Sequence, residues 1–180
     1  MKKNLDRTIE IPEGVTISIN RDEVKVSGSG KENVRKFAFG KIVSKQEGSA
    51  LTLSAKKATR RESRILGTIE GHIKNMIKGL NEEFVYKLEV CNVHFPMTVK
   101  LEGNKVRIKS FLGEKVDRIA NVDADSKVEI KGSKITVTSH KIESAGTTAT
   151  NIEKAARLTG RDRRIFQDGI FLTEKNGRVI

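Results

Sequence analysis

The sequence predicts an α+β fold of two similar domains in tandem that arose by internal duplication, each an antiparallel sheet with one helix packed on a face. Alternating apolar residues followed by a helical apolar pattern occur twice, in the same order. The matched segments are 16–19 with 98–101, 48–53 with 132–137, and 67–73 with 146–152, at offsets of 82, 84 and 79 residues. Because the offset changes only between elements, the insertions and deletions fall in loops, which tolerate them.

The first domain is expected to span residues 1–81. Val15, Ile17 and Ile19 alternate with polar residues, and the alternation resumes at Val24 and Val26 after the turn-forming segment 20–22. This pattern predicts an antiparallel hairpin. A helix follows, because apolar residues recur at helical spacing at Ile65, Ile69, Ile73, Met76 and Leu80. A glycine and an asparagine at the end of this stripe place the domain boundary after residue 81.

The second domain is expected to span residues 82–180. Its opening strand carries Phe84, Tyr86, Leu88 and Val90 on one face. A hairpin turns at Gly103-Asn104, and two further strands end near residues 130 and 137. The helix stripe consists of Ala145, Ala149, Ile152 and Ala156. After this helix comes a basic segment with no counterpart in the first domain.

The overall charge favours a polyanionic partner. The chain has 35 lysines and arginines against 23 aspartates and glutamates, a formal net charge of +12. Such a charge attracts nucleic acid or an anionic membrane surface. No apolar run approaches the roughly 20 residues that a bilayer span needs, and the N-terminus lacks a signal-type apolar region. We therefore expect a cytoplasmic protein that has no membrane partner.

Motifs for catalysis or cofactor binding are missing from the sequence. The three histidines, His72, His94 and His140, lack ligand spacing, and Cys91 is the only cysteine. The segment Gly28-Ser29-Gly30-Lys31 lacks the full spacing of a phosphate loop and predicts only a bend after a strand. We expect no enzymatic activity, no cofactor, no metal and no small-molecule substrate.

The organised arginines of the second domain are the main candidate site. Arg161, Arg163 and Arg164 lie within four residues of one another. Guanidinium groups bind phosphate oxygens in a bidentate way, so this cluster favours folded RNA. Arg157, Lys141 and Lys175 are further candidate contacts. A Gln-Asp-Gly turn signal interrupts the apolar stretch that follows, and the residues expected to hold the loop are Ile165, Phe166, Gly169, Ile170 and Phe171.

A second basic tract lies between the second hairpin and the helix of the first domain. Its basic residues are Lys56, Lys57, Arg60, Arg61 and Arg64. A solvated loop and a secondary contact with RNA or a neighbouring protein both account for the tract.

These features resemble a known family. The pattern Val24-Lys25-Val26-Ser27-Gly28 continuing to Phe37, the duplication, and the run from Arg161 to Ile170 are similar to the L6 family of large-subunit ribosomal proteins, in its archaeal and eukaryotic type. The resemblance spans essentially the whole chain. It implies a structural component of the large ribosomal subunit in the cytoplasm, bound to ribosomal RNA near the sarcin–ricin loop and the stalk base, with neighbouring ribosomal proteins as partners. It also implies that Arg161, Arg163 and Arg164 contact the RNA.

One alternative of a different class stays open at this point. A free-standing adaptor protein could use its sheet edges and basic loops to hold acidic proteins, with incidental affinity for RNA.

Overall fold

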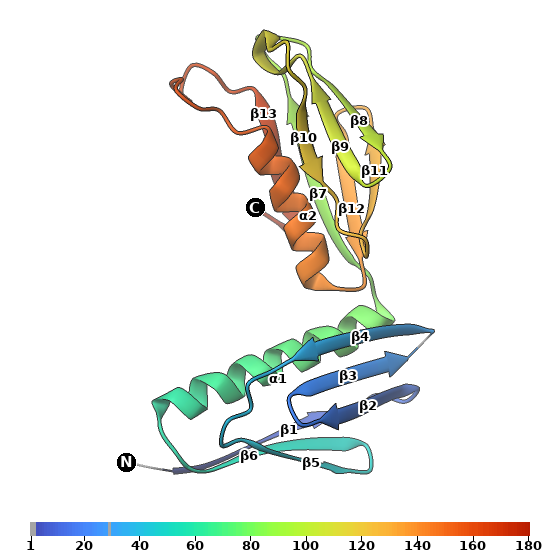
Figure 1. Cartoon of the computed structure of the whole chain (residues 1–180), viewed down its shortest axis with the longest axis vertical. Coiled ribbons are helices and arrows are strands. Elements are labelled where there is room, and N and C mark those ends of the chain that lie inside the picture. The colour runs from blue at the N-terminus through green and yellow to red at the C-terminus, as the bar shows by residue number, and fades with distance from the viewer. Residues whose placement is uncertain (1–2, 29) are drawn as a thin grey trace. The chain divides into compact units, whose positions relative to one another are not determined.

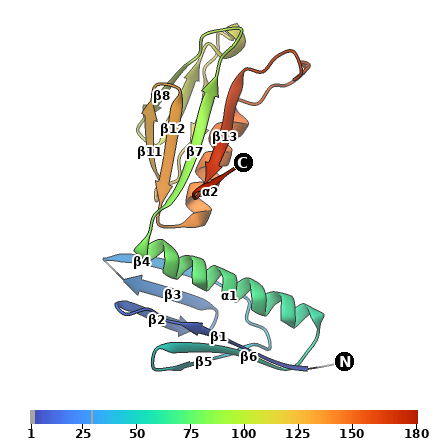
Figure 2. The ribbon, with the colours of Figure 1, turned by 180° about the vertical axis from the view of Figure 1, so that it is seen from behind.

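The computed structural model of the chain describes residues 3–28 and 30–180. The chain divides into two compact units, the first ending at Glu82 and the second spanning Glu83–Ile180. Figures 1 and 2 show the elements of each unit from opposite sides.

The first unit contains six strands and one helix. They are β1 (Lys3–Glu10), β2 (Val15–Asn20), β3 (Glu23–Gly28), β4 (Lys31–Lys36), β5 (Val43–Glu47), β6 (Ala50–Ala58) and α1 (Arg60–Asn81). The hairpin expected from alternation is therefore confirmed as β2 and β3. The sequence also predicted a bend after β3, at residues 28–31. One of these residues, Ser29, lies outside the described residues.

All strands of the first unit pair antiparallel, in two three-stranded sheets of order β1-β6-β5 and β2-β3-β4. Helix α1 contacts strands of both sheets. Its stripe is buried at Leu66, Ile69 and Ile73, where it packs against Leu51 and Val26 in a single core. Ile65, which was predicted to belong to this stripe, is only partly buried, and the neighbouring Leu66 is buried instead.

Helix α1 begins at a capping box. The Thr59 hydroxyl accepts a hydrogen bond from the backbone N–H of Arg61 at 3.3 Å, and the Glu62 carboxylate accepts one from the backbone N–H of Thr59 at 2.9 Å. The hydrogen bonds from the Thr59 side chain and backbone lower the pKa of Glu62 to about 2. These bonds satisfy backbone donors that the first turn of a helix leaves free.

The second unit repeats this series and extends it. Its elements are β7 (Phe84–Cys91), β8 (Thr98–Glu102), β9 (Lys105–Lys109), a 3₁₀ turn (Phe111–Gly113), β10 (Arg118–Asn121), β11 (Lys127–Lys131), β12 (Lys134–Ser139), α2 (Ile142–Ala155), β13 (Gly169–Lys175) and β14 (Arg178–Val179). The predicted turn at Gly103-Asn104 joins β8 to β9.

The sheets of the second unit are a three-stranded sheet of order β10-β9-β8 and a five-stranded sheet of order β11-β12-β7-β13-β14, both antiparallel. Helix α2 contacts both sheets and buries Ala145, Ala149 and Ile152 against Leu88 and Ile135. Order and direction match the first unit strand for strand from β7 to α2. This confirms the predicted class of two duplicated α+β units, with the strands of each unit divided between two sheets.

Strands β13 and β14 are the addition that distinguishes the second unit. Strand β13 pairs with the edge of β7 that does not face β12, and Figure 2 shows it beside β7. The chain reaches this position through residues 156–168, which run from the end of α2 to Gly169. The arginine run of the sequence lies in this connection, which we call the arginine loop (residues 157–168).

Candidate nucleic-acid interface

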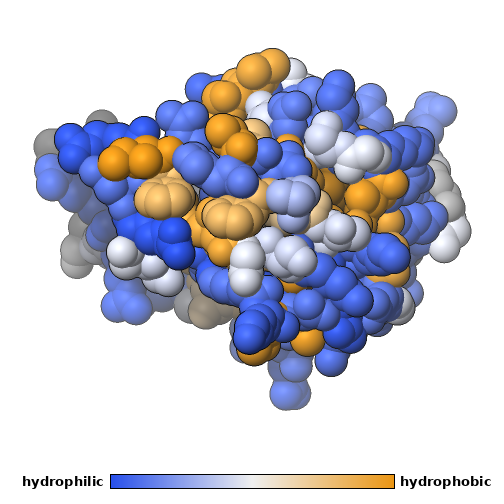
Figure 3. Space-filling model, turned by 90° about the horizontal axis from the view of Figure 1, so that it is seen from above, coloured by the Kyte–Doolittle hydropathy of each residue, from blue (hydrophilic) through white to orange (hydrophobic). Residues whose placement is uncertain are grey.

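Three loops of the second unit meet at one end of it. They are residues 92–97 after β7, residues 110–117 after β9, and the arginine loop. His94 of the first loop contacts Asp168, and the ring of Phe95 lies 3.8 Å from where a Cβ on Gly113 would stand. Figure 3 views the molecule from this end and shows apolar patches among hydrophilic residues. Exposed apolar side chains on these loops are Val93, Phe95, Val116 and Ile165.

Asp168 attaches the arginine loop to the first of these loops. Its side chain is buried, with 1% exposed, and its two carboxylate oxygens accept hydrogen bonds from the His94 backbone N–H at 2.9 Å and contact His94 Nδ1 at 2.6 Å. Burial opposes ionisation of Asp168, but the hydrogen bonds and charge of His94 outweigh it and lower the pKa of the carboxyl. Asp168 is therefore a carboxylate that holds the loop in place.

Arg161 is positioned on the same attachment point. The ring of Phe166 lies 5.0 Å from the His94 ring, and the guanidinium carbon of Arg161 lies 4.8 Å from the Phe166 ring centre. A guanidinium over an aromatic ring gains about 0.5–1 kcal/mol at an exposed site. Asp168, His94, Phe166 and Arg161 thus form a continuous series of contacts that orients a surface cation.

Arg118 fixes the backbone at Arg157. Its guanidinium donates to the carbonyl oxygens of Ala155, the last residue of α2, at 3.0 Å and of Arg157, just past the helix, at 2.9 Å. It also forms a bidentate pair with Glu114, at 2.6 and 2.7 Å, and lies 4.1 Å from the Phe111 ring centre. These bonds satisfy carbonyls that a helix C-terminus leaves unpaired. The position from which the Arg157 side chain projects is consequently rigid.

Arg157 and Arg163 line one groove between α2 and the arginine loop. Its volume is about 260 Å³, and Lys154, Leu158 and Asp168 are among the other residues that line it. Arg157 and Arg163 are both exposed. The groove therefore gathers cations from both sides of the loop at a scale suited to a few phosphate groups.

Arg164 differs from its neighbours because its charge is already paired. It contacts Asp162 through Nη2 at 2.7 Å and Nε at 3.1 Å, and its backbone N–H donates to the same carboxylate at 2.9 Å. These hydrogen bonds lower the pKa of Asp162 and raise that of Arg164. Backbone N–H groups of residues 165 and 166 donate to the Asp162 carbonyl, so Asp162 organises the turn of the loop.

The predicted loop anchors are only partly the right ones. Ile170 is 1% exposed and Phe171 is half-buried, but Ile165 is 63% exposed and is therefore not a buried anchor. The Gln-Asp-Gly segment forms no turn either, because Gly169 begins β13. Gly169 matters for packing: a Cβ there would stand 2.9 Å from Cζ of the Phe171 ring.

The remaining predicted contacts of this unit lie at its other end. Lys141 occupies the N-cap position of α2, about 24 Å along the helix from Arg157, and its side chain pairs with Asp125 at 2.6 Å. Lys175 ends β13 and lies 5.8 Å from the ring of Tyr86. The structure therefore gathers Arg157, Arg161, Arg163 and Arg164 at one site and leaves Lys141 and Lys175 outside it.

Comparison with known proteins decides the family. A family model described as Ribosomal protein L6 matches residues 11–83 and 95–169, one segment in each unit. The chain belongs to the ribosomal protein L6 family. It is 42% identical over 172 residues to large ribosomal subunit protein uL6 of Methanococcus vannielii, covering 96% of this chain and 94% of that protein. It is 42% identical over 168 residues to the uL6 protein of Aeropyrum pernix, covering 93% and 92%.

Membership of the L6 family confirms the resemblance found in the sequence, and the compared relatives are archaeal. It makes the chain a ribosomal protein, a structural component, located in the ribosome in the cytoplasm. It favours the ribosomal hypothesis over the free-standing adaptor. Among the described residues, neither helix has the length and apolar character of a bilayer span.

The second basic tract of this L6-family chain forms no loop, which rules out one of its two interpretations, the solvated loop. Lys56 and Lys57 belong to the end of β6, and Arg60 opens α1. Arg61 and Arg64 line a separate groove of about 540 Å³ on the first unit, together with Arg35, Lys36 and Phe37. Five sequential cations are thus divided between a strand and a helix, because β6 runs directly into the capping box.

Arg118 and His94 are the positioning residues that sequence reasoning missed. Arg118 donates to the carbonyls of Ala155 and Arg157, which lie 37 and 39 positions along the chain. His94 contacts the carboxylate of Asp168, 74 positions away. No local pattern marks either residue. Among residues 3–28 and 30–180, no three histidine, cysteine or acidic side chains are placed to hold a metal ion. Burial and the charges of Glu89 and Asp168 raise the pKa of Cys91, which favours its thiol form.

Proposed function

We propose that this chain binds large-subunit ribosomal RNA through the arginine loop of its second unit, near the sarcin–ricin loop and the base of the factor-binding stalk. The observation that carries the proposal is the gathering of Arg157, Arg161 and Arg163 around a loop that Asp168 and Arg118 hold rigid. The location on the subunit rests on the family resemblance. The partners are ribosomal RNA and the ribosomal proteins that adjoin it.

Phosphate contacts account for the binding better than base stacking does. The guanidinium groups are exposed, and a guanidinium binds two phosphate oxygens at once. Phe166, the aromatic side chain of the loop, is already in contact with His94 and Arg161. Because hydrogen bonds hold the Arg157 backbone carbonyl and the Asp168 side chain, little ordering is required on binding. The interface therefore recognises the shape of folded RNA.

A salt titration tests this proposal with one informative variant and one control. The affinity of the full chain for a ribosomal RNA fragment containing the sarcin–ricin loop and stalk base should fall with salt, with a log–log slope of about −0.7 to −0.9 per phosphate contact. Arg163→Ala should reduce this slope by about one unit, because it removes one contact. Lys175→Ala, at the other end of the unit, should leave the slope unchanged. Equal slopes for Arg163→Ala and the unsubstituted chain would refute the assignment.

Arg61 and Arg64 provide a secondary contact through the groove of the first unit. Their shared groove with Arg35 and Lys36 is the supporting observation. The double variant Arg61→Ala and Arg64→Ala should reduce protection of the RNA from hydroxyl radicals at a site other than that of Arg163, whereas Lys56→Ala should not. An unchanged protection pattern would assign this groove to a protein neighbour instead.

A further inference from the structure

The edge of β1 is the most conspicuous difference between the two units. In the second unit the corresponding strand, β7, has neighbours on both sides, β12 and β13. In the first unit β1 pairs with β6 alone, and among the described residues no strand lies on its other edge. Strand β1 spans eight residues, and an open edge of this length presents unpaired backbone groups that pair readily with another chain.

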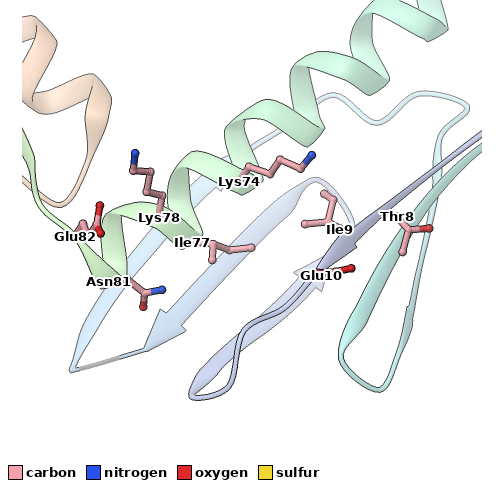
Figure 4. A pocket seen from close by; sticks show the side chains of 8 residues that line it. All are labelled: Thr8, Ile9, Glu10, Lys74, Ile77, Lys78, Asn81 and Glu82. Atoms are coloured by element: carbon pink, nitrogen blue, oxygen red, sulfur yellow. The ribbon is translucent and has the colours of Figure 1, made fainter. Parts of the chain in front are cut away.

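The register identifies which backbone groups face outward. The backbone N–H of Ile11 donates to the Ser49 carbonyl at 2.8 Å, and Ile9 pairs with Leu51. Hydrogen-bonded pairs alternate in an antiparallel ladder, so Thr8 and Glu10 direct their N–H and C=O groups away from β6. Both residues line a groove of about 700 Å³ between β1 and α1. Figure 4 shows Ile77 reaching from α1 toward this strand.

The equivalent strand edge of the second unit is covered by the chain itself. Leu88 pairs with Ile135 as Ile9 pairs with Leu51, so Thr8 corresponds to Lys87 and Glu10 to Glu89. Lys87 and Glu89 are the residues that β13 covers: Glu174 pairs with Lys87 at 2.8 Å, and Thr173 donates to the Lys87 carbonyl at 3.1 Å.

The helix walls of the two grooves also correspond. At the repeat offset of 79 residues, Lys74, Ile77 and Lys78 match three residues of the groove beside the arginine loop, which are Glu153, Ala156 and Arg157. That groove measures about 260 Å³, against about 700 Å³ in the first unit. The larger volume is consistent with the missing strand.

We propose that the open edge of β1 accepts an extended segment of a neighbouring protein, which completes the sheet of the first unit as β13 completes that of the second. The segment runs antiparallel to β1, places an apolar side chain opposite Ile9, and carries an acidic group toward Lys78. A peptide suits this groove because strand addition uses alternating backbone donors and acceptors. RNA does not, because a sugar–phosphate backbone lacks the alternating N–H and C=O groups that pair with a strand edge. The inference is independent of which RNA the second unit binds.

Photo-crosslinking within assembled large subunits tests the identity of the occupant. Benzoylphenylalanine in place of Asn81, an exposed residue that lines the groove, should crosslink to one segment of another protein, and peptide mapping should find alternating apolar residues there. In the same background, Thr8→Pro removes one outward N–H and should lower the crosslink yield about tenfold, since an edge strand tolerates proline but cannot donate from it. Thr8→Val keeps the backbone intact and should change the yield by less than about twofold. A crosslink to RNA or to a second copy of this chain would overturn the proposal. Equal crosslink yields from Thr8→Pro, Thr8→Val and the chain that retains Thr8 would also overturn it.

Hydrogen exchange of the unsubstituted chain provides a measurement that does not depend on the variants folding. The backbone amides of Thr8 and Glu10 should exchange at least about tenfold more slowly in the large subunit than in the free chain. Unchanged rates would overturn the proposal. The salt slope of the arginine loop, measured on the free chain, reports separately on RNA binding.

Discussion

Replacement of Asp168 by asparagine tests whether this carboxylate holds the arginine loop. Asparagine has nearly the same shape and keeps an oxygen for the His94 backbone N–H. It loses the negative charge that both contacts with His94 now involve. A hydrogen bond to a charged group contributes about 1.5–3 kcal/mol. The His94 side chain is 34% exposed, so water compensates for part of the loss, and we expect the second unit to lose about 1–2 kcal/mol of stability.

Tyrosine fluorescence makes this measurement specific to the second unit. The chain has one tyrosine, Tyr86, and no tryptophan, and Tyr86 is buried in the second core. Urea unfolding followed by this signal at pH 7 should show a lower midpoint for Asp168→Asn with the same slope. RNA affinity should fall by up to about tenfold, because the loop then spends part of its time detached.

The difference in stability between Asp168→Asn and the unsubstituted chain should also depend on pH, which provides a second criterion. Because the folded-state pKa of Asp168 lies below its ordinary value of 3.8, the carboxylate stabilises the fold above that value. Its contribution is lost as the pH falls through the folded-state pKa. The difference in stability between the two proteins should therefore be largest at pH 7 and should decrease toward zero below about pH 4. Identical midpoints at pH 7, or a gap that persists undiminished to about pH 3, would refute the assigned role.

Three further substitutions follow from the packing of the loop and the helices. Gly169→Ala should destabilise the second unit by about 1–3 kcal/mol, since its Cβ would collide with the Phe171 ring, whereas Gly67→Ala in α1 meets nothing within 4 Å and should stabilise the first unit by about 0.5–1 kcal/mol. Circular dichroism melting, together with tyrosine fluorescence, distinguishes the two units, and a destabilising Gly67→Ala would contradict the helix packing. Arg118→Lys should raise hydrogen exchange after α2 and weaken RNA binding, because an ammonium cannot pair with Glu114 in a bidentate way and reach two carbonyls at once. Unchanged exchange would mean that Arg118 does not fix this backbone.

Local spacing was sufficient to predict both helices, the β2–β3 and β8–β9 hairpins and the duplication. It did not predict strands β1, β4, β10, β13 and β14. Val24 and Val26 alternate because a strand buries every second side chain, and Ile69 and Ile73 recur because a helix buries one face. The errors arose where a local signal was overridden. Ile165 is apolar yet exposed, and the Gln-Asp-Gly segment lies at a strand start, because pairing of β13 with β7 extends the chain there.

The candidate site could be predicted only in part for the same reason. Sequence proximity correctly grouped Arg161, Arg163 and Arg164, which share one loop. Sequence proximity could not predict how far Lys141 and Lys175 lie from the arginine loop. Both lie at the other end of the unit, because α2 and β13 each extend along it.

The sequence by itself determined that this chain is a basic, duplicated α+β protein whose second half carries an additional arginine segment. Periodicity, charge and repeat offsets are properties of neighbours along the chain, so they can be read without coordinates. Only the tertiary structure decided that Asp168 meets His94, that Arg118 holds the backbone at Arg157, and that β1 keeps an open edge. Those contacts join residues that are tens of positions apart, and they depend on how the strands pair and where the helix packs.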